Sequence, residues 1–314
     1  MKNLIAFPCL LLLVVPHWGW SQESQVRETN VPGNAAASHL FLQVHVSGGE
    51  LFLSESGKCG DAQARISAAD TSTKWLVSNR LASNGNAYQE AIVHRSGALA
   101  SNAAPEANLR KTYRVDPMAS QREVGAVRSE FRPDPTMSTD LSLHLGSGSS
   151  LLDLSHLTLH NLSVESAFSD LVITYSKPNQ TTMQKMHVHA ANSTVVLKHL
   201  ELSRAKLVQV QNDMGDTKLM LGEKPKEIAE LPIIELRNGV GDCLVVVSSK
   251  NPVRVVVKTG VLAKAEVGDE SGFSKLQNTP EPTFENAAAK NLPDAQVTMI
   301  HCNLDFGELV LISR

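Results

Sequence analysis

This sequence of 314 residues has few aromatic side chains and almost no net charge. Phe, Tyr and Trp make up 4% of the chain, and its 29 Lys and Arg residues are matched by 32 Asp and Glu. A nucleic-acid-binding surface needs basic side chains that neutralise phosphates, and often aromatic rings on which bases stack. The composition therefore excludes nucleic acid as an expected partner.

Cysteine is also scarce, with four residues in the chain. Cys59, Cys243 and Cys302 follow the first apolar run, and no two of them have the Cys-x-x-Cys spacing of a redox or zinc pair. Cys243 and Cys302 lie in strand-like segments. They are either bridged in an oxidising compartment or buried as free thiols that pack as small apolar side chains.

Long apolar runs are absent except at the N-terminus, where residues 4–15 form one. The run is shorter than the roughly 20 residues that span a bilayer. Lys2 precedes it, and Gly19 and Ser21 put small residues three and one positions before a cleavage site. We therefore predict a signal peptide over residues 1–21, export to the periplasm or cell surface, and no transmembrane segment in the mature chain.

Sequence motifs of catalysis and cofactor binding are missing as well. The chain has no Gly-x-Ser-x-Gly, His-Glu-x-x-His or Gly-x-x-x-x-Gly-Lys segment and no dinucleotide-binding fingerprint. We assign no catalytic, cofactor-binding or metal-binding residues, and we expect a protein that is not an enzyme.

The chain does contain alternating apolar and polar residues, the pattern of half-buried strands. We expect residues 22–38 to be a flexible polar leader. Residues 39–138 are predicted to form N-terminal β layers, either as a separate subdomain or as part of one continuous stack. The strands expected there are residues 40–46, 51–53, 74–79, 88–94, 110–115 and 124–131.

The second half of the chain repeats this pattern. Residues 162–173, 208–219 and 234–245 share one form: an alternating strand, a turn that ends in Gly-Asp or Ser-Asp, and a second alternating strand. A β unit that cannot bury its own apolar face, repeated along the chain, indicates a stacked, solenoid-like architecture. The alternation slips by one residue at Ser155 and again at His160, where we expect the chain to turn a corner.

These passages, together with residues 151–166 and 193–202, resemble the toast-rack β-repeat domains of bacterial adhesin-type proteins and of the extracytoplasmic part of LiaF-type envelope-stress proteins. The resemblance covers residues 139–314, with residues 251–260 as a continuation of the repeats and residues 297–312 as the last layer. It implies a single-handed β stack at the cell envelope and brings no catalytic residues with it. LiaF-type proteins carry N-terminal membrane helices that this sequence lacks, so a signalling role is not implied.

Acidic turn residues are the first candidates for a site. Asp170, Asp216 and Asp242 recur at one position of the repeat. Stacked in a row, they would suit calcium or the acid–base cleavage of a polysaccharide. The alternative is turn chemistry, in which each side chain accepts hydrogen bonds from nearby backbone N–H groups. Turn chemistry is favoured because each repeat supplies one carboxylate, whereas calcium takes about six or more oxygens.

Histidines are the second candidates. His187 and His189 lie two apart in a strand-like run and therefore point to one face, about 6.7 Å apart. His156, His160 and His199 are also predicted to point outward, because leucine neighbours occupy the inward positions. The five form a transition-metal patch if their faces coincide. Otherwise they are solvent-facing side chains, which is favoured because no Cys or acidic residue stands at ligand spacing.

The sequence therefore predicts an exported, mostly-β, non-catalytic binding or structural module of the cell envelope, adhesin-like, whose flat polar faces contact an envelope protein or a glycan. The alternative is a glycan-active β-solenoid hydrolase or lyase. That activity requires a cleft with clustered Asp, Lys and Arg, whereas this chain spreads its charges evenly. Because the ends of a β stack are exposed edges, we also expect oligomerisation through them, or capping by the N-terminal segment.

Overall fold

The computed structural model describes residues 25–32, 39–53, 61–68, 73–81, 87–95, 128–132, 138–155, 157–229 and 231–314. Most of these residues are in strands, which confirms the expected mostly-β fold. The strands are β1 (Gln25–Pro32), β2 (His39–Leu53), β3 (Asp61–Ala68), β4 (Thr73–Leu81), β5 (Ala87–Arg95), β6 (Arg128–Arg132), β7 (Ser138–Asp153), β8 (Thr158–Thr174), β9 (Met183–Ala190), β10 (Val195–Lys198), β11 (Ala205–Met214), β12 (Thr217–Leu221), β13 (Ile233–Val240), β14 (Cys243–Val247), β15 (Val253–Glu266), β16 (Phe273–Lys275), β17 (Thr283–Asn286) and β18 (Thr298–Ser313). The short 3-10 helices are η1 (Leu200–Leu202), η2 (Asp269–Ser271), η3 (Ala287–Ala289) and η4 (Asp294–Gln296). The strand expected at residues 110–115 and the signal peptide lie outside the described residues.

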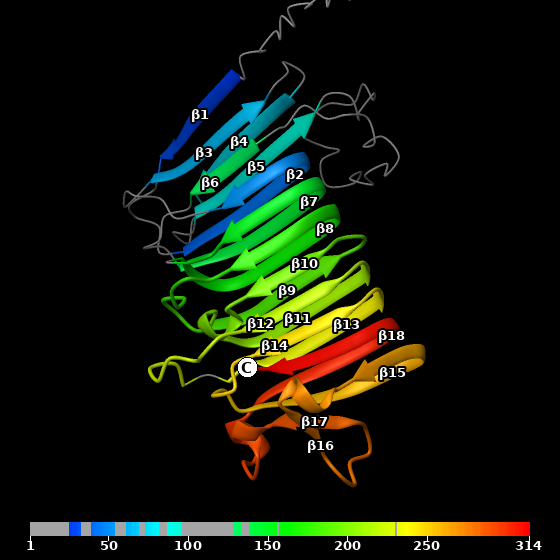
Figure 1. Cartoon of the computed structure of the whole chain (residues 1–314). Coiled ribbons are helices and arrows are strands. Elements are labelled where there is room, and N and C mark those ends of the chain that lie inside the picture. Colours follow the sequence, from blue (N-terminus) through cyan, green and yellow to red (C-terminus); the bar gives the residue numbers. More distant parts are fainter. Residues whose placement is uncertain are drawn as a thin grey trace, which may run out of the picture.

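Successive strands stack in parallel, so that the chain forms coils (Figure 1). The first half of β8 pairs with β9 and its second half with β10. In the same way β9 and β10 pair with β11 and β12, and these with β13 and β14. Each coil thus contributes one strand to a first sheet and one to a second sheet. In the long strands the two halves meet at a bend, on the right in Figure 1, which we call the bend edge.

The repeats found in the sequence lie in register in this stack. Leu162 pairs with Met186, Met186 with Val208, and Val208 with Ile234. The coil of β9 and β10, which has no Gly-Asp turn, therefore stands between the first and second of the three repeats. These registers confirm the stacked, solenoid-like prediction.

The last strand of the chain is not the last layer of the stack, contrary to the prediction for residues 297–312. β18 pairs with β13 and β14 on one side and with β15 on the other. The chain runs out to β15, forms β16 and β17 beyond it, and returns to insert β18. Sequence alternation could not show this order, because β15 and β18 both carry the pattern of a stack strand.

The N-terminal strands continue the stack from β2, which pairs in parallel with β7. On its other edge β2 pairs with β5 and then with β6. Antiparallel strands follow, with β4 on β5, β3 on β6 and β1 on β3. Residues 25–32, expected within a flexible leader, form β1 instead. Its partner β3 is distant in sequence, and a polar segment gives no local sign of such pairing.

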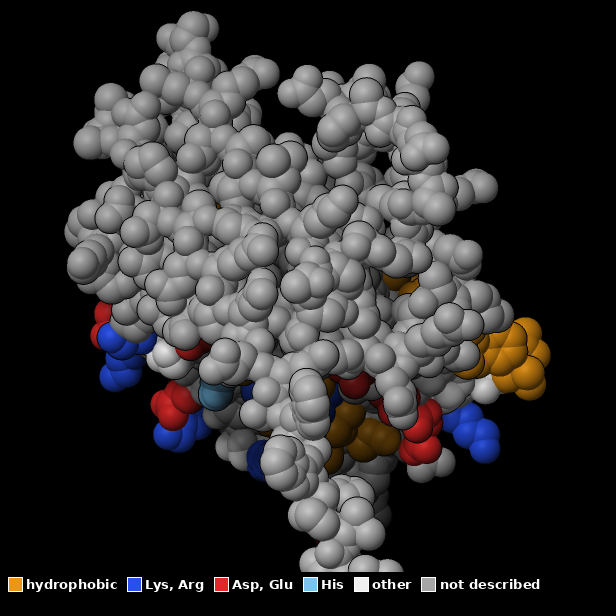
Figure 2. Space-filling view, turned by 90° about the horizontal axis from the view of Figure 1, so that it is seen from above, with side chains coloured by type: hydrophobic (Ala, Val, Ile, Leu, Met, Phe, Trp, Pro, Cys, Tyr) orange, Lys and Arg blue, Asp and Glu red, His pale blue; other side chains and the backbone are white. Residues whose placement is uncertain are grey.

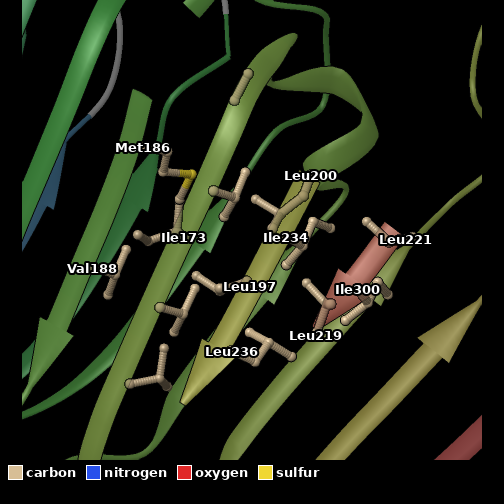
Figure 3. Close-up of a cluster of buried hydrophobic side chains, with 14 of the residues drawn as sticks. Ile173, Met186, Val188, Leu197, Leu200, Leu219, Leu221, Ile234, Leu236 and Ile300 are labelled. Carbon is tan, nitrogen blue, oxygen red and sulfur yellow. The ribbon is translucent and has the colours of Figure 1, made fainter. Parts of the chain in front are cut away.

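Inward side chains of the two sheets form one continuous aliphatic core (Figure 3). Because the core is a thin layer between two sheets, Leu, Val and Ile fill it and few aromatic rings are needed. Among the buried side chains of the first sheet are Met186, Val188, Ile234, Leu236 and Ile300, and among those of the second are Ile173, Leu197, Leu219 and Leu221.

Buried polar side chains line the inside of the bend edge. The Nδ2 group of Asn212 donates to the carbonyls of Ser193 (3.0 Å) and Gly215 (3.1 Å), and that of Asn238 donates to Gly241 (2.8 Å). These bonds satisfy carbonyl groups at the point where the chain leaves one sheet for the other. The bend is therefore a fixed feature of the coil.

The C-terminal end of the stack is partly covered. β17 pairs with the first half of β15, and Phe273 and Phe284 are buried against the core. Arg254 of β15 lies 2.9 Å from a carboxylate oxygen of Glu285 on β17. In the described part of the chain, the second half of β15 has no strand on its outer side, so pairing of stack ends stays a prediction. No helix among the described residues is long and apolar enough to cross a membrane.

Candidate functional site

Asp170, Asp216 and Asp242 lie in one row along the bend edge. Asp216 and Asp242 are neighbours on adjacent coils, and Thr194 stands between Asp170 and Asp216. Glu308 of β18 continues the row beyond Asp242. We call these residues the carboxylate row; the three Asp residues do share one row, the arrangement considered as a possibility from the sequence.

The Asp side chains of this row bond successive coils. Oδ1 of Asp170 accepts a hydrogen bond from the N–H of Thr194 (3.2 Å), and Oδ1 of Asp216 accepts one from Asp242 (3.0 Å). Oδ1 of Asp242 accepts one from Glu308 (3.0 Å). Turn chemistry, the favoured interpretation, is therefore correct in that each Asp side chain accepts a backbone N–H group. The N–H group belongs to the next coil and not to the same turn. No group of three or more His, Cys, Asp or Glu among the described residues is arranged to hold a metal ion.

The histidines named by the sequence do not form one patch. His187 and His189 both lie on β9, whereas His199 follows β10 in a left-handed conformation with a φ of 58°. His160 is the extra residue of a β-bulge between β7 and β8. The slip in alternation there therefore marks a bulge within β8 and not the corner that was expected. His156 lies outside the described residues.

The first sheet instead carries histidine–carboxylate pairs that the sequence analysis missed. Nδ1 of His144 lies 2.9 Å from Oε2 of Glu165, and Nε2 of His189 lies 3.1 Å from Oδ2 of Asp213. Burial raises the pKa of Asp213, but hydrogen bonds from Gln211 and His189 outweigh it and lower that pKa. Only the register of adjacent coils brings these partners together, so their sequence spacing gives no sign of them.

Cys243 and Cys302 are both free and buried. They face the core from the second and the first sheet. A hydrogen bond between the two thiols, together with burial, raises the pKa of Cys243. Of the two readings of these cysteines, the structure has the buried free thiols, and a raised pKa keeps such a thiol protonated and unreactive.

Large apolar side chains form an exposed row at the bend edge. They stand at one position on adjacent coils, and Asn192 interrupts the row once. The row spans about 24 Å, from the strand spacing of about 4.8 Å. We call it the corner row; its members and their exposed fractions are Phe168 38%, Met214 50%, Val240 48%, Phe306 47% and Leu262 68%.

Glycines at the bend follow three of these side chains. Met214, Val240 and Phe306 each precede a glycine with positive φ, which is 132° at Gly241. A Cβ at Gly241 would lie 2.4 Å from the carbonyl oxygen of Gly215, so only glycine fits there. The sequence does carry this signal, as an apolar residue before each Gly-Asp or Gly-Glu pair.

Next to the bend, the outer face of the second sheet is also mainly apolar, which corrects the expectation of flat polar faces for this part of the surface. Its strands are continuous apolar runs, as in residues 171–173, 195–197, 244–247 and 309–312. Such runs are typical of parallel strands that are buried on both faces. We call the outward side chains of this sheet that lie beside the bend the sheet row. Lys218 interrupts the row between Val196 and Leu244. The members of the row are Leu151, Val172, Val196, Leu244 and Val310.

The carboxylate row therefore lies between two apolar rows. Along one coil the three rows are two residues apart, as in Val240, Asp242 and Leu244. The spacing from Asp242 to Leu244 is about 6.6 Å for extended backbone, whereas the chain bends at Gly241 between Val240 and Asp242. We call the three rows together the edge surface. In Figure 2 hydrophobic side chains protrude on the right, the side on which the long strands bend in Figure 1, and both basic side chains and carboxylates lie near them.

Comparisons with known proteins identify no family for this chain. No family model and no curated protein matches the chain. A solved structure named as a putative cell adhesion protein from Clostridium sporogenes is similar with a TM-score of 0.42 at 13% identity, covering 93% of this chain and 100% of that one. A second, named as a putative adhesin from Bacteroides fragilis, has a TM-score of 0.38 at 9% identity over 93% and 99%. At these values neither similarity establishes a shared fold.

Proposed function

We propose that this chain is an exported, adhesin-like binding module of the cell envelope, in which the stacked coils are a scaffold and the edge surface makes the contact. One observation carries the proposal: the corner row leaves large apolar side chains exposed on successive coils. Apolar side chains scattered singly on a surface are ordinary, whereas a contiguous exposed patch is typical of an interaction site.

The construction of the edge supports this role. Hydrogen bonds between coils hold the Asp side chains in place, and glycines follow Met214, Val240 and Phe306 at the bend. A surface that is ordered before binding loses little conformational freedom when a partner docks. The proposed module is therefore a preorganised surface with no need of a closing loop.

The cellular location rests on the predicted signal peptide over residues 1–21 and on the toast-rack resemblance of residues 139–314. Both are inferences from the sequence. They place the proposed module in the periplasm or at the cell surface, where the partner is an envelope protein or a glycan.

The test is calorimetric titration of residues 22–314 with purified envelope proteins and cell-wall glycans, followed by measurement of glycan chain length. We expect saturable binding of a partner that is left chemically unchanged. The double variant Met214→Gln/Val240→Thr should weaken that binding. Ile233→Thr is the matched control, because Ile233 is 47% exposed but lies away from the edge surface. Shortening of a glycan during the titration would contradict the proposal and support the hydrolase or lyase.

A further inference from the structure

The edge surface also carries information on the chemistry of its partner. Asp170, Asp216 and Asp242 are exposed, and none of them forms an ion pair with another described residue. Their Oδ1 atoms accept backbone N–H groups of the next coil. The edge surface also holds cations: Lys218 stands in the sheet row two residues from Asp216, and Lys264 of β15 pairs with Glu308. Between Asp170 and Asp242 the middle of the edge surface is therefore mainly negative, and its margins are apolar except at Asn192 and Lys218.

Further carboxylates stand on the first-sheet side of the corner row. Asp213 lies next to Met214 in sequence, and Asp305 lies next to Phe306. These two differ from the carboxylate row, since Asp213 contacts His189 at 3.1 Å and Asp305 lies 3.7 Å from Arg237. The uncompensated charge is thus concentrated between the corner row and the sheet row.

This charge pattern selects among possible occupants. A second copy of the chain, docked edge to edge, would bring carboxylates against carboxylates, and like charges juxtaposed in an interface disfavour association. An anionic phospholipid surface is disfavoured for the same reason. A neutral glycan would leave the carboxylates uncompensated beside apolar side chains. A cationic and apolar polypeptide matches both features.

We infer that the edge surface binds a polypeptide segment that presents Lys or Arg between apolar side chains on one face. The inference rests on the proposed binding function and names its partner class. The carboxylate row and the sheet row are about 6.6 Å apart along a coil, which is the spacing of residues i and i+2 on one face of an extended strand. An extended segment with a basic residue two positions from an apolar one therefore places a cation on the carboxylate row and an apolar side chain on the sheet row. A further apolar side chain of the segment contacts the corner row at the bend.

The probe is a fluorophore-labelled peptide, Val-Ser-Lys-Ser-Val-Ser-Lys-Ser-Val, titrated with residues 22–314 and followed by fluorescence anisotropy. Two peptides of equal length serve as controls, one with Glu in place of Lys and one with Asn in place of Val. We expect saturable binding of the first peptide, binding at least about tenfold weaker for each control, and weakening with added salt.

Protein variants locate the site. Asp216→Asn/Asp242→Asn removes two charges but keeps an oxygen that accepts the N–H of the next coil, so the fold should be retained. We expect this variant and Met214→Gln/Val240→Thr each to weaken binding at least about fivefold. Glu227→Gln/Glu270→Gln removes the same charge from exposed residues of the 222–232 loop and of η2 and should leave binding unchanged, as should Ile233→Thr.

Three results would overturn the inference. One is the absence of saturable binding to the Val/Lys peptide; another is binding that the edge variants do not weaken. The third is that the peptide fails to bind while the chain either forms a dimer in light scattering or binds vesicles of anionic phospholipid. In that case the edge variants would abolish the dimer or the vesicle binding. If an envelope glycan binds and the edge variants leave its affinity unchanged, the binding module stands and this inference falls.

Discussion

At the scale of single residues, the bend depends on glycines that no other residue can replace. Gly241 has a φ of 132°, and an added Cβ would meet the carbonyl oxygen of Gly215 at 2.4 Å. Because that atom belongs to the backbone of the next coil, relief requires the coils to separate. The close approach of adjacent coils, more than the turn itself, makes glycine necessary.

We predict that Gly241→Ala lowers the free energy of unfolding by at least about 2 kcal/mol, through backbone strain and the clash with the adjacent coil. Gly268→Ala is the control, because a Cβ there has nothing within 4 Å and should change stability by no more than about 0.5 kcal/mol. Urea unfolding followed by circular dichroism measures both. Equal stability of the two variants would show that the coils are not packed this closely.

The hydroxyl group of Tyr175 is buried without a hydrogen bond to satisfy it. It is fully buried, and its hydroxyl has no hydrogen-bond partner among the described residues. Burial raises the pKa of Tyr175 well above its ordinary value of 10.0. The folded state therefore disfavours the ionised form. The stability linked to this group is complete below the ordinary pKa and is lost as pH rises from there toward the raised, folded-state pKa.

We predict that Tyr175→Phe raises the free energy of unfolding at pH 7 by about 1 kcal/mol, because it removes an unpaired buried hydroxyl. Between about pH 9.5 and pH 11 the variant should also lose less stability than the parent chain, since it has no phenol to ionise. Urea unfolding at a series of pH values tests both effects. A variant that is less stable than the parent at pH 7 would indicate that the hydroxyl is hydrogen-bonded.

At the scale of elements, assembly of the C-terminal end of the stack depends on the order of its strands. β18 pairs with β13 and β14 on one side and β15 on the other, so the last residues of the chain lie inside the stack. β15 cannot take its place in the stack before β18 is inserted. Completion of this end therefore requires that β18 is inserted first.

We predict that deletion of residues 308–314 abolishes cooperative unfolding, because it removes the second half of β18 and leaves the edge of β14 unpaired. Deletion of residues 22–32 removes β1, which pairs with β3. That deletion should leave a cooperative transition. Thermal unfolding followed by circular dichroism distinguishes the two, and a transition in the 308–314 deletion like that of the parent chain would contradict the inserted position of β18.

At the scale of the whole molecule, the chain is predicted to leave the cytoplasm. Expression of residues 1–314 in a Gram-negative host should give a periplasmic protein whose mass shows Gln22 as its first residue. Leu11→Arg places a charge in the apolar run and should leave the leader attached. Intact mass spectrometry of the periplasmic and cytoplasmic fractions decides the matter. Uncleaved parent chain in the cytoplasm would rule out export and, with it, the envelope role.

The sequence by itself determined the class of the fold, because alternation of apolar and polar residues is a local property of strands. It also determined the alignment of the three Gly-Asp and Ser-Asp turns, since Leu162, Val208 and Ile234 begin repeats that the structure stacks in register. The slip in alternation at His160 is also a local feature, but the sequence alone suggested a corner where the structure has a bulge.

Only the tertiary structure decided which strands are neighbours and which surfaces are exposed. The insertion of β18, the pairing of β1 with β3 and the pair of His189 with Asp213 depend on contacts between distant segments. The edge surface has the same origin. Met214, Val240 and Phe306 are ordinary strand residues in sequence, and only the bend and the stacking of coils turn them into one exposed row.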